Sequence, residues 1–335
     1  MSNVLELRPQ SFHDYVGQEH IKKLLRMAVG AAKMRGEPLD HILLSGPAGM
    51  GKTTLANVIA NELGAGFVVI NAASLESTSQ ITDILMALSP FDVVFIDEIH
   101  RLSIKAEELL YHPMEDGVLE SEEIVEYKTP RFSEEFTREL LKLGGLGVYD
   151  VLYQTTKQKE TIVHDLPPFT LIGATTNAGG LSKPLRDRFP LSLQLALYSL
   201  EEMELIVKQK CQMLEIEITD SAARNLAGRS RSTARVAVNF VRRCRDTAQM
   251  LGRNIIDDFI VNTTLDMMRV DKMGLTEADR QYLQVLADNK RPTGLKTLAS
   301  QCMQDEDTIQ NVLEPYLMQM GFVARQSNGR IITSK

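Results

Sequence analysis

Apolar positions in the first half of the chain follow two different spacings. They recur every three to four residues over 20–36 and 53–63, a spacing that predicts amphipathic helices. They run without interruption in four short segments, which predicts buried strands at 41–46, 67–73, 92–97 and 169–176. Strands that alternate with helices and are apolar on both faces are typical of a parallel sheet covered on each side. We therefore expect an α/β fold in this part of the chain.

The residues after Pro190 predict two further units. The strand pattern fades there, and residues 199–268 are rich in helical periodicity, as in a small all-helical domain. From Leu275 three more helices are predicted, and a β-hairpin that turns at 327–329 follows them. Three short helices and a terminal hairpin are typical of a winged helix. We divide the 335 residues into three domains, in line with their length: 1–190, 191–270 and 271–335.

Residues 117–164 interrupt this pattern between a helix and the fourth strand. Stretches at 117–129 and 148–156 are strand-like, and 132–143 between them has the spacing of an amphipathic helix. We expect a hairpin with a helical excursion at its tip. The apolar face of that helix either binds a partner protein or packs back on its own domain; it comprises Phe132, Phe136, Leu140 and Leu143. A DNA contact is disfavoured, because the sequence ESEEIVE beside it is acidic.

The composition is that of an ordinary globular protein, with 44% hydrophobic and 24% charged residues. It excludes a disordered chain, a collagen-like fibre and a disulfide scaffold. The 37 basic and 44 acidic residues give a net charge of −7, so any contact with nucleic acid must be a local patch. Cys211, Cys244 and Cys302 lack the spacing of a zinc site and are expected to be buried thiols. The sequence has neither a signal-peptide pattern nor an apolar run of membrane-spanning length, and we expect a cytoplasmic protein.

The segment 46–53 has the spacing G-x-x-x-x-G-K-[ST] between a predicted strand and a predicted helix. Gly46, Gly49 and Gly51 allow the backbone to wrap a triphosphate and to point its N–H groups inward. The helix that follows directs its N-terminus at the phosphates. Lys52 supplies a positive charge to the β and γ oxygens, and the hydroxyl of Thr53 is a ligand for Mg²⁺. The motif predicts an ATP-binding loop.

Polar residues follow the third and fourth predicted strands. Asp97 ends the strand VVFID and would hold Mg²⁺, and Glu98, which follows it, would orient and polarise the attacking water. Thr176 ends the strand that carries GATT and would contact the γ-phosphate or the water. Arg188, in the short segment PLRDRF, either forms a surface ion pair or reaches the nucleotide of a neighbouring subunit as an arginine finger.

These motifs resemble those of AAA+ ATPases and, among them, of the RuvB family of Holliday-junction branch-migration motors. The resemblance includes LRP at 7–9, DYVGQ at 14–18, GPAGMGKTTLA, FIDEIHRLS, EELLY and MED. It resumes after residue 164 with DLPPFTLIGATT, PLRDRF, NVLEPYLMQMGF and NGR. DLPPFTLIGATT and EPYL-x-x-x-GF are specific to this family among AAA+ proteins. The resemblance implies a P-loop AAA+ domain with a parallel sheet, a small helical lid and a C-terminal winged helix.

The resemblance also implies roles for individual residues. Those expected to line the adenine pocket are Leu7, Arg8, Tyr15 and Val16. Those expected to hold the phosphates are Gly49, Lys52, Thr53 and Thr54. Asp97 and Glu98 would be the Walker B pair and Thr176 sensor 1. Arg188 would be the finger acting on the neighbouring subunit. Tyr198 would lie beside the nucleotide, Arg235 would be sensor 2, and Arg325 and Arg330 would contact DNA.

The implied activity is ATP hydrolysis with Mg²⁺, driving branch migration of Holliday junctions in recombination and repair. The implied partners are duplex DNA, a RuvA-like junction-binding protein, further copies of this chain in a hexamer, and a resolvase. The chain departs from the family pattern at four single positions, Gly117, Asn177, Ala234 and Asn328. Its 117–164 segment is also much longer than the family's hairpin, which docks on RuvA.

Other functions remain open on the sequence. A clamp-loader-like switch would use the same ATP site to place another protein on DNA without moving along it. A divergent duplex-DNA translocase of a phage or mobile element would have a different partner. A winged-helix scaffold that binds nucleotide without hydrolysing it is disfavoured, because Lys52, Asp97, Glu98 and Arg188 are all present.

Overall fold

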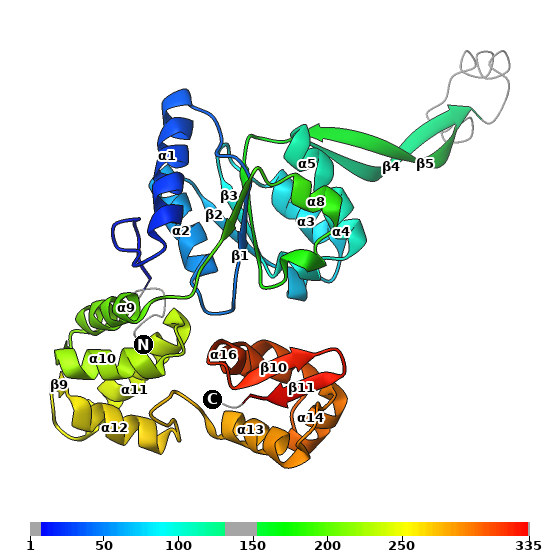
Figure 1. The fold of residues 1–335 in the computed structure, drawn as a ribbon. Helices are drawn as coiled ribbons and strands as arrows, with labels where there is room; N and C mark the ends of the chain where they lie inside the picture. Colours follow the sequence, from blue (N-terminus) through cyan, green and yellow to red (C-terminus); the bar gives the residue numbers. More distant parts are fainter. Residues whose placement is uncertain (1–7, 131–152, 334–335) are drawn as a thin grey trace.

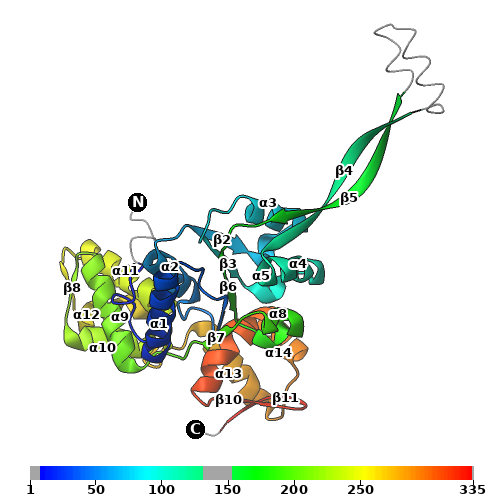
Figure 2. The ribbon, with the colours of Figure 1, turned by 90° about the horizontal axis from the view of Figure 1, so that it is seen from above.

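The computed structural model describes residues 8–130 and 153–333. A large domain carries the central sheet, and a helical lid and a small winged domain lie beside one another beneath it in the view of Figure 1. A long two-stranded ribbon projects from the large domain (Figures 1 and 2). No helix within the described ranges is long and apolar enough to cross a membrane.

The central sheet has five parallel strands in the order β2-β3-β6-β1-β7. They are β1 (Ile42–Ser45), β2 (Phe67–Asn71), β3 (Val93–Asp97), β6 (Thr170–Thr175) and β7 (Leu191–Gln194). The four strands predicted from uninterrupted apolar runs are confirmed. The prediction that the strand pattern ends at Pro190 is wrong, because β7 pairs with β1 at the edge of the sheet. This strand alternates apolar and polar residues, since only one of its faces is covered, and so it lacks the continuous apolar run of a central strand.

Two layers of helices cover the sheet, and each layer has its own apolar core. Ile42 and Leu44 belong to the core under α1 (Glu19–Arg35) and α2 (Lys52–Leu63). Leu43, between them, belongs to the opposite core with α3 (Thr78–Met86) and α4 (Ile104–Leu109). Adjacent residues of one strand therefore enter different cores, which explains the uninterrupted apolar runs. The other helical segments of this domain are short: η2 (Ala72–Ser74), η3 (Ile99–Arg101), α5 (Tyr111–Glu115), η4 (Ala178–Gly180) and α8 (Lys183–Asp187).

The projecting ribbon consists of β4 (Val118–Pro130) and β5 (Tyr153–Asp165), paired antiparallel from Val118↔Asp165 to Pro130↔Tyr153. The predicted hairpin in 117–164 is therefore confirmed. The predicted helix over 132–143 lies outside the described residues, as does the beginning of the strand predicted over 148–156.

The lid is built from four helices and one pair of very short strands. Its elements are α9 (Leu200–Met213), β8 (Glu217–Ile218), α10 (Asp220–Arg229), α11 (Ala234–Met250), β9 (Ile255–Ile256) and α12 (Asp258–Met267). Ser199 and Glu202 form a capping box at the start of α9, which satisfies backbone donors of its first turn. Apolar side chains of the lid, such as Met203 and Phe240, continue the core of α1 and α2. The lid is thus packed against the large domain as well as tethered to it.

The C-terminal unit has helices followed by a hairpin, as predicted from the sequence. Its elements are α13 (Glu277–Asn289), α14 (Leu295–Cys302), α15 (Glu306–Thr308), a π-helical turn η5 (Ile309–Leu313), α16 (Glu314–Gln319), β10 (Val323–Gln326) and β11 (Gly329–Ile332). Tyr282, Leu298 and Leu317 lie in an apolar cluster of its own, separate from the two cores of the large domain. We call this unit the wing.

Candidate functional site

A cavity of about 280 Å³ lies between the large domain and the lid. The large domain contributes the following residues: Arg8, Pro9, Tyr15, Val16, Ala48, Gly49, Gly51, Lys52, Thr53, Thr54, Asp97 and Glu98. The lid and the segment before it contribute Tyr198, Ile206, Gln209, Lys210, Ala234, Arg235 and Val238. The structure therefore brings together most of the expected nucleotide-binding residues. Leu7 lies outside the described residues.

The loop between β1 and α2 turns through left-handed backbone at its glycines. Gly46, Gly49 and Gly51 have φ values of 141°, 80° and 91°. A Cβ on Gly51 would come within 2.9 Å of the hydroxyl of Tyr15, so a larger residue would strain both the backbone and its neighbour. Helix α2 begins at Lys52, directly after this turn. Its first N–H groups can therefore meet an anion in the cavity.

Lys52 is almost fully buried at the floor of the cavity. Its Nζ donates hydrogen bonds to the carbonyl oxygens of Gly46 at 2.7 Å and Pro47 at 3.0 Å. Burial lowers the pKa of Lys52, and the positive charge of Arg235 acts in the same direction, whereas Glu98 and Asp97 raise it. A bound polyphosphate would place further negative charge beside this buried ammonium group and so favour its charged form.

Three oxygen-bearing side chains at the ends of β3 and β6 lie near a fourth, Thr53, in the first turn of α2. The hydroxyl of Thr53 lies 3.5 Å from Oδ2 of Asp97, so the pair offers the hard oxygen ligands that Mg²⁺ prefers. Thr176 donates a hydrogen bond to Oε2 of Glu98 at 3.1 Å. Glu98 has a left-handed φ of 51°, which turns its side chain away from the strand direction. These groups fit a magnesium ion at Thr53 and Asp97 and a water-activating carboxylate beside it.

His100 contacts both Glu98 and the end of β6. Its Nδ1 lies 3.3 Å from Oε2 of Glu98 and 3.0 Å from the hydroxyl of Thr175. The backbone N–H of Asn177 donates to the same hydroxyl at 2.9 Å. The Glu98 carboxylate is thus held by two side chains, Thr176 and His100.

Tyr15 and Tyr198 join the large domain to the segment before the lid. Their hydroxyls lie 3.2 Å apart, and both donate to the carbonyl oxygen of Met50, at 3.3 Å and 2.9 Å. Burial raises the pKa of both phenols, that of Tyr15 well above its usual value. These neutral hydroxyls support the backbone of the glycine-rich loop in addition to lining the cavity.

The lid helix α9 adds residues that the sequence analysis missed. Ile206, Gln209 and Lys210 line the cavity. Lys210 is 5% exposed, and burial lowers its pKa to about 8. Helical spacing places these residues on one face of α9, but only tertiary packing shows that this face meets the cavity. Arg235, at the start of α11, reaches the cavity as expected, and its backbone N–H donates to the carbonyl of Gly49 at 3.3 Å.

Arg188 is not among the residues that line the cavity of its own chain. It forms an ion pair with Glu115 at 2.6 Å, and its guanidinium lies 4.3 Å from the ring centre of Tyr111. Its Nη1 donates to the carbonyl of Pro184 at 3.0 Å. One quarter of this side chain is exposed. The structure of a single chain therefore shows the surface ion pair, one of the two roles that the sequence left open.

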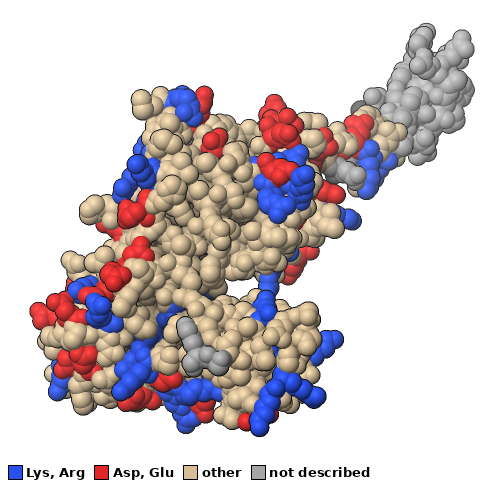
Figure 3. All heavy atoms as spheres, in the orientation of Figure 1, with Lys and Arg blue, Asp and Glu red and all other residues tan. Residues whose placement is uncertain are grey.

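Arg325 and Arg330 face each other across the hairpin of the wing and share one acid. Both bind Glu314, at 2.6 Å and 2.7 Å, and the hydroxyl of Tyr282 donates to it at 3.0 Å. The Glu314 side chain is fully buried. Arg325 is 52% exposed and Arg330 only 14%, so the two arginines differ in what they can offer to a ligand. Figure 3 shows further Lys and Arg side chains on the surface of the wing.

Three family models match the chain. The "Holliday junction DNA helicase RuvB P-loop domain" matches residues 7–128 and 147–195. The "RuvB AAA lid domain" matches 198–271, and the "RuvB C-terminal winged helix domain" matches 272–335. The first match passes over residues 129–146, so the part without a counterpart is narrower than the 117–164 segment that the sequence analysis singled out.

Curated relatives and solved structures agree with these matches. The Holliday junction branch migration complex subunit RuvB of Campylobacter hominis is 41% identical over 98% of this chain and 88% of its own length. The Thermotoga maritima protein of the same name is 40% identical over 100% of this chain and 92% of its own. A structure described as the Thermotoga maritima RuvB Holliday junction branch migration motor has a TM-score of 0.80 and 39% identity, with 98% and 96% of the two chains covered. The chain belongs to the RuvB family of AAA+ ATPases.

Proposed function

We propose that this protein hydrolyses ATP and uses the energy to drive branch migration of Holliday junctions. The observation that carries the proposal is the cavity between the large domain and the lid. Lys52, Glu98 and the pair Thr53 and Asp97 line it from one domain, and Arg235 lines it from the other. Thr176 is not among the lining residues and reaches the site through its hydrogen bond to Glu98. A nucleotide there would contact both domains, so its hydrolysis and release would change how they are held together.

The chain's own residues have distinct roles in the proposed reaction. Lys52 and the N–H groups at the start of α2 bind the β- and γ-phosphates. Mg²⁺, held by Thr53 and Asp97, would neutralise charge on these phosphates. Glu98 accepts a proton from the attacking water, and the hydrogen bond from Thr176 fixes the direction of its carboxylate. Arg188 of a neighbouring subunit stabilises the charge that develops in the transition state.

The proposed assembly follows from the place of Arg188. Since it lies outside the cavity of its own chain, an arginine finger requires a second copy, and we propose a homohexameric ring on duplex DNA. A RuvA-like protein would bring the ring to the junction, a resolvase would act on the same junction, and the protein would act in the cytoplasm. We further propose that the large domain extends through β7 to about residue 195, since that strand completes its sheet.

The test is the rate of ATP hydrolysis and of junction migration on a synthetic four-way junction, with and without RuvA. Motor function predicts ATP-dependent conversion of the junction into two duplexes, and stimulation of hydrolysis by duplex DNA. A clamp-loader-like switch would hydrolyse ATP on DNA without moving the junction. The relatives reported above are branch migration subunits, which favours the motor.

A further inference from the structure

The turn between the lid helices α10 and α11 contacts two parts of the molecule at once. It consists of residues 230–233 and leads directly into Arg235 in the first turn of α11. Two of its residues, Arg231 and Ser232, have left-handed φ values of 53° and 52°. Ser230 is fully buried, and its carbonyl accepts from the backbone N–H of Thr233 at 3.1 Å and from its hydroxyl at 3.2 Å. These contacts fix the turn in one shape.

The end of the turn and the first residues of α11 touch the phosphate-binding loop. The backbone N–H of Arg235 donates to the carbonyl of Gly49. A Cβ on Gly49 would lie 3.2 Å from Cβ of Arg235 and 3.5 Å from Cβ of Thr233, so the two segments are in close contact. A nucleotide that moves the loop would therefore also move the turn.

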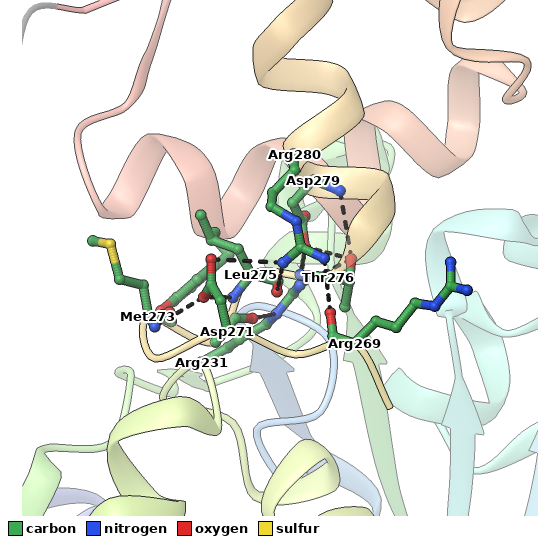
Figure 4. A network of polar contacts seen from close by, with 10 residues as sticks. Arg231, Arg269, Asp271, Met273, Leu275, Thr276, Asp279 and Arg280 are labelled. Carbon is green, nitrogen blue, oxygen red and sulfur yellow. Dashed lines mark hydrogen bonds and ion pairs between the residues drawn. The ribbon is translucent and has the colours of Figure 1, made fainter. Parts of the chain in front are cut away.

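The other side of the turn reaches into the wing through Arg231 (Figure 4). Nε of Arg231 donates to the carbonyl of Gly274 at 2.9 Å, and Nη2 forms an ion pair with Asp279 at the start of α13. Its guanidinium lies 5.1 Å from the ring centre of Tyr316 on α16, and the hydroxyl of Tyr316 donates to Met273 at 2.6 Å. Arg231 thus binds the linker and two helices of the wing.

Asp279, the partner of Arg231, is a buried carboxylate whose loss of this cation would cost free energy. Asp279 is fully buried, and it also accepts hydrogen bonds from the backbone N–H of Thr276 at 2.7 Å and from its hydroxyl at 2.5 Å. Among the described residues it forms an ion pair with Arg231, and its Oδ1 has no hydrogen-bond partner there. A buried carboxylate that loses its cation must draw in water or move. The contact therefore resists separation of the lid from the wing.

A second close approach lies beside this ion pair. Gly274 has a φ of 77°, and a Cβ there would come within 2.5 Å of the carbonyl oxygen of Arg229 at the end of α10. The linker is thus in contact with the lid at both Arg229 and Arg231. Within the described ranges the apolar cluster of the wing contains no residue of the lid, whereas these polar and backbone contacts join the two units directly.

We propose that Arg231 is a positioning residue that fastens the wing to the lid, so that both turn as one body when the lid closes on nucleotide. Only one part of this inference rests on the proposed function, namely that the attachment transfers nucleotide-driven movement to DNA. The attachment itself is a property of the single chain and can be measured without hydrolysis. Removal of Arg231 would let the wing turn independently about the linker at residues 271–275.

The attachment can be tested by the distance between spin labels on the two units. Met250, on α11, and Ser300, on α14, are exposed and can be changed to cysteine. The native residues Cys211, Cys244 and Cys302 are buried, and burial raises the pKa of each thiol, so they resist labelling. The chain labelled at positions 250 and 300, with no other change, should give one narrow distance distribution. The distribution should be the same with ADP and with a non-hydrolysable ATP analogue.

Three variants separate a fastening role from general support of the wing. Arg231→Met should broaden the distance distribution, and Arg231→Lys should do so less. Arg231→Met combined with Asp279→Asn removes the unpaired buried charge, so the wing should fold, yet the distribution should stay broad. The matched control is Arg269→Met, which breaks an exposed ion pair with Glu277 in the same linker region and should leave the distance narrow. A narrow distance in the double variant would overturn the proposal.

A functional readout completes the test. Coupling between two sites typically changes affinity by about 5- to 150-fold. Wild-type protein should show such a ratio between its DNA affinities with the ATP analogue and with ADP, and Arg231→Met should bring the ratio close to one while retaining basal ATP hydrolysis. A retained ratio in a variant with a broad distance would overturn the coupling role. If the DNA affinity of wild-type protein is the same with both nucleotides, the proposed function fails. The spin-label distances would then still show whether Arg231 fastens the wing to the lid.

Discussion

Arg330 donates from Nε to Glu314 at 2.7 Å, and the carboxylate that it meets is completely buried in the wing. Arg325 binds the same carboxylate from the opposite strand but keeps 52% of its side chain exposed. The two arginines, alike in the sequence, therefore differ in the structure. Arg330 neutralises a buried acid, whereas Arg325 can also meet a phosphate.

Alanine substitutions should separate these two roles. Arg325→Ala should weaken binding to duplex DNA of any sequence, because phosphates carry no base code, and should reduce the slope of log K against log[salt] by about 0.9. Arg330→Ala should chiefly lower the free energy of unfolding, by about 1–3 kcal/mol, because Glu314 loses a buried partner. Salt-dependent binding and calorimetry measure the two effects. An unchanged slope in Arg325→Ala would place the DNA contact elsewhere.

The roles of Lys52 and Glu98 predict different defects. Lys52→Ala should abolish tight ATP binding, since the cavity loses the ammonium group at its floor. Glu98→Gln should bind ATP but not hydrolyse it, because a carboxamide cannot accept the proton of water. Equilibrium binding of a fluorescent ATP analogue and the release of phosphate distinguish the two. Hydrolysis at the wild-type rate by Glu98→Gln would show that another group is the base.

Arg188 should act on a neighbouring subunit. Arg188→Ala should bind ATP normally and lose most hydrolysis, where a finger contributes roughly 10³–10⁵ in rate. Mixing it with Lys52→Ala protein should restore part of the activity, because one subunit supplies the finger and the other an intact cavity. Absence of recovery at every mixing ratio would contradict action between subunits. Arg186→Ala, in the same short segment, is the matched control.

Lys210 should make the stability of the protein depend on pH. Its pKa is lowered to about 8 in the folded chain, so the unfolded chain binds more protons between pH 8 and 10.5 and stability should rise over this range. The gain is on the order of 3 kcal/mol, from about 1.4 kcal/mol per pH unit. Lys210→Met should be more stable than wild type at pH 7 and should lack this rise. Chemical unfolding at several pH values tests it, and parallel curves for the two proteins would contradict it.

The residues at 129–146, the first two of which belong to β4, should contribute to partner binding. We expect replacement of residues 129–146, which the family model passes over, by a short glycine-containing turn to leave folding and ATP binding intact. Stimulation by RuvA at a junction should fall, because a partner-docking element is removed. Unchanged stimulation would eliminate this role, and loss of solubility would favour packing of the segment on its own domain.

The sequence predicted most where local chemistry determines structure. The segment 46–53 combines glycines, a lysine and a threonine at the spacing of a phosphate-binding loop, and the structure has that loop between β1 and α2. What it could not predict depends on tertiary packing. Helical spacing does not show that α9 turns Lys210 toward the cavity, and the edge strand β7 lacks the apolar run of a central strand. Nor does the order of residues show that Glu314 lies beneath two arginines brought together by a hairpin.

The ribbon of β4 and β5 has a consequence for the solubility of the free subunit. In the described part of the chain each strand pairs only with the other, so each outer edge presents backbone donors and acceptors to solvent. Such edges are templates for pairing with another chain, and the apolar side chains of Ile124 and Val163 are exposed on the ribbon. Glu126 and Lys157, an ion pair across the ribbon, place charges that two ribbons would have to bury on joining. These exposed charges contribute little to stability, yet they would oppose pairing of ribbons between concentrated subunits.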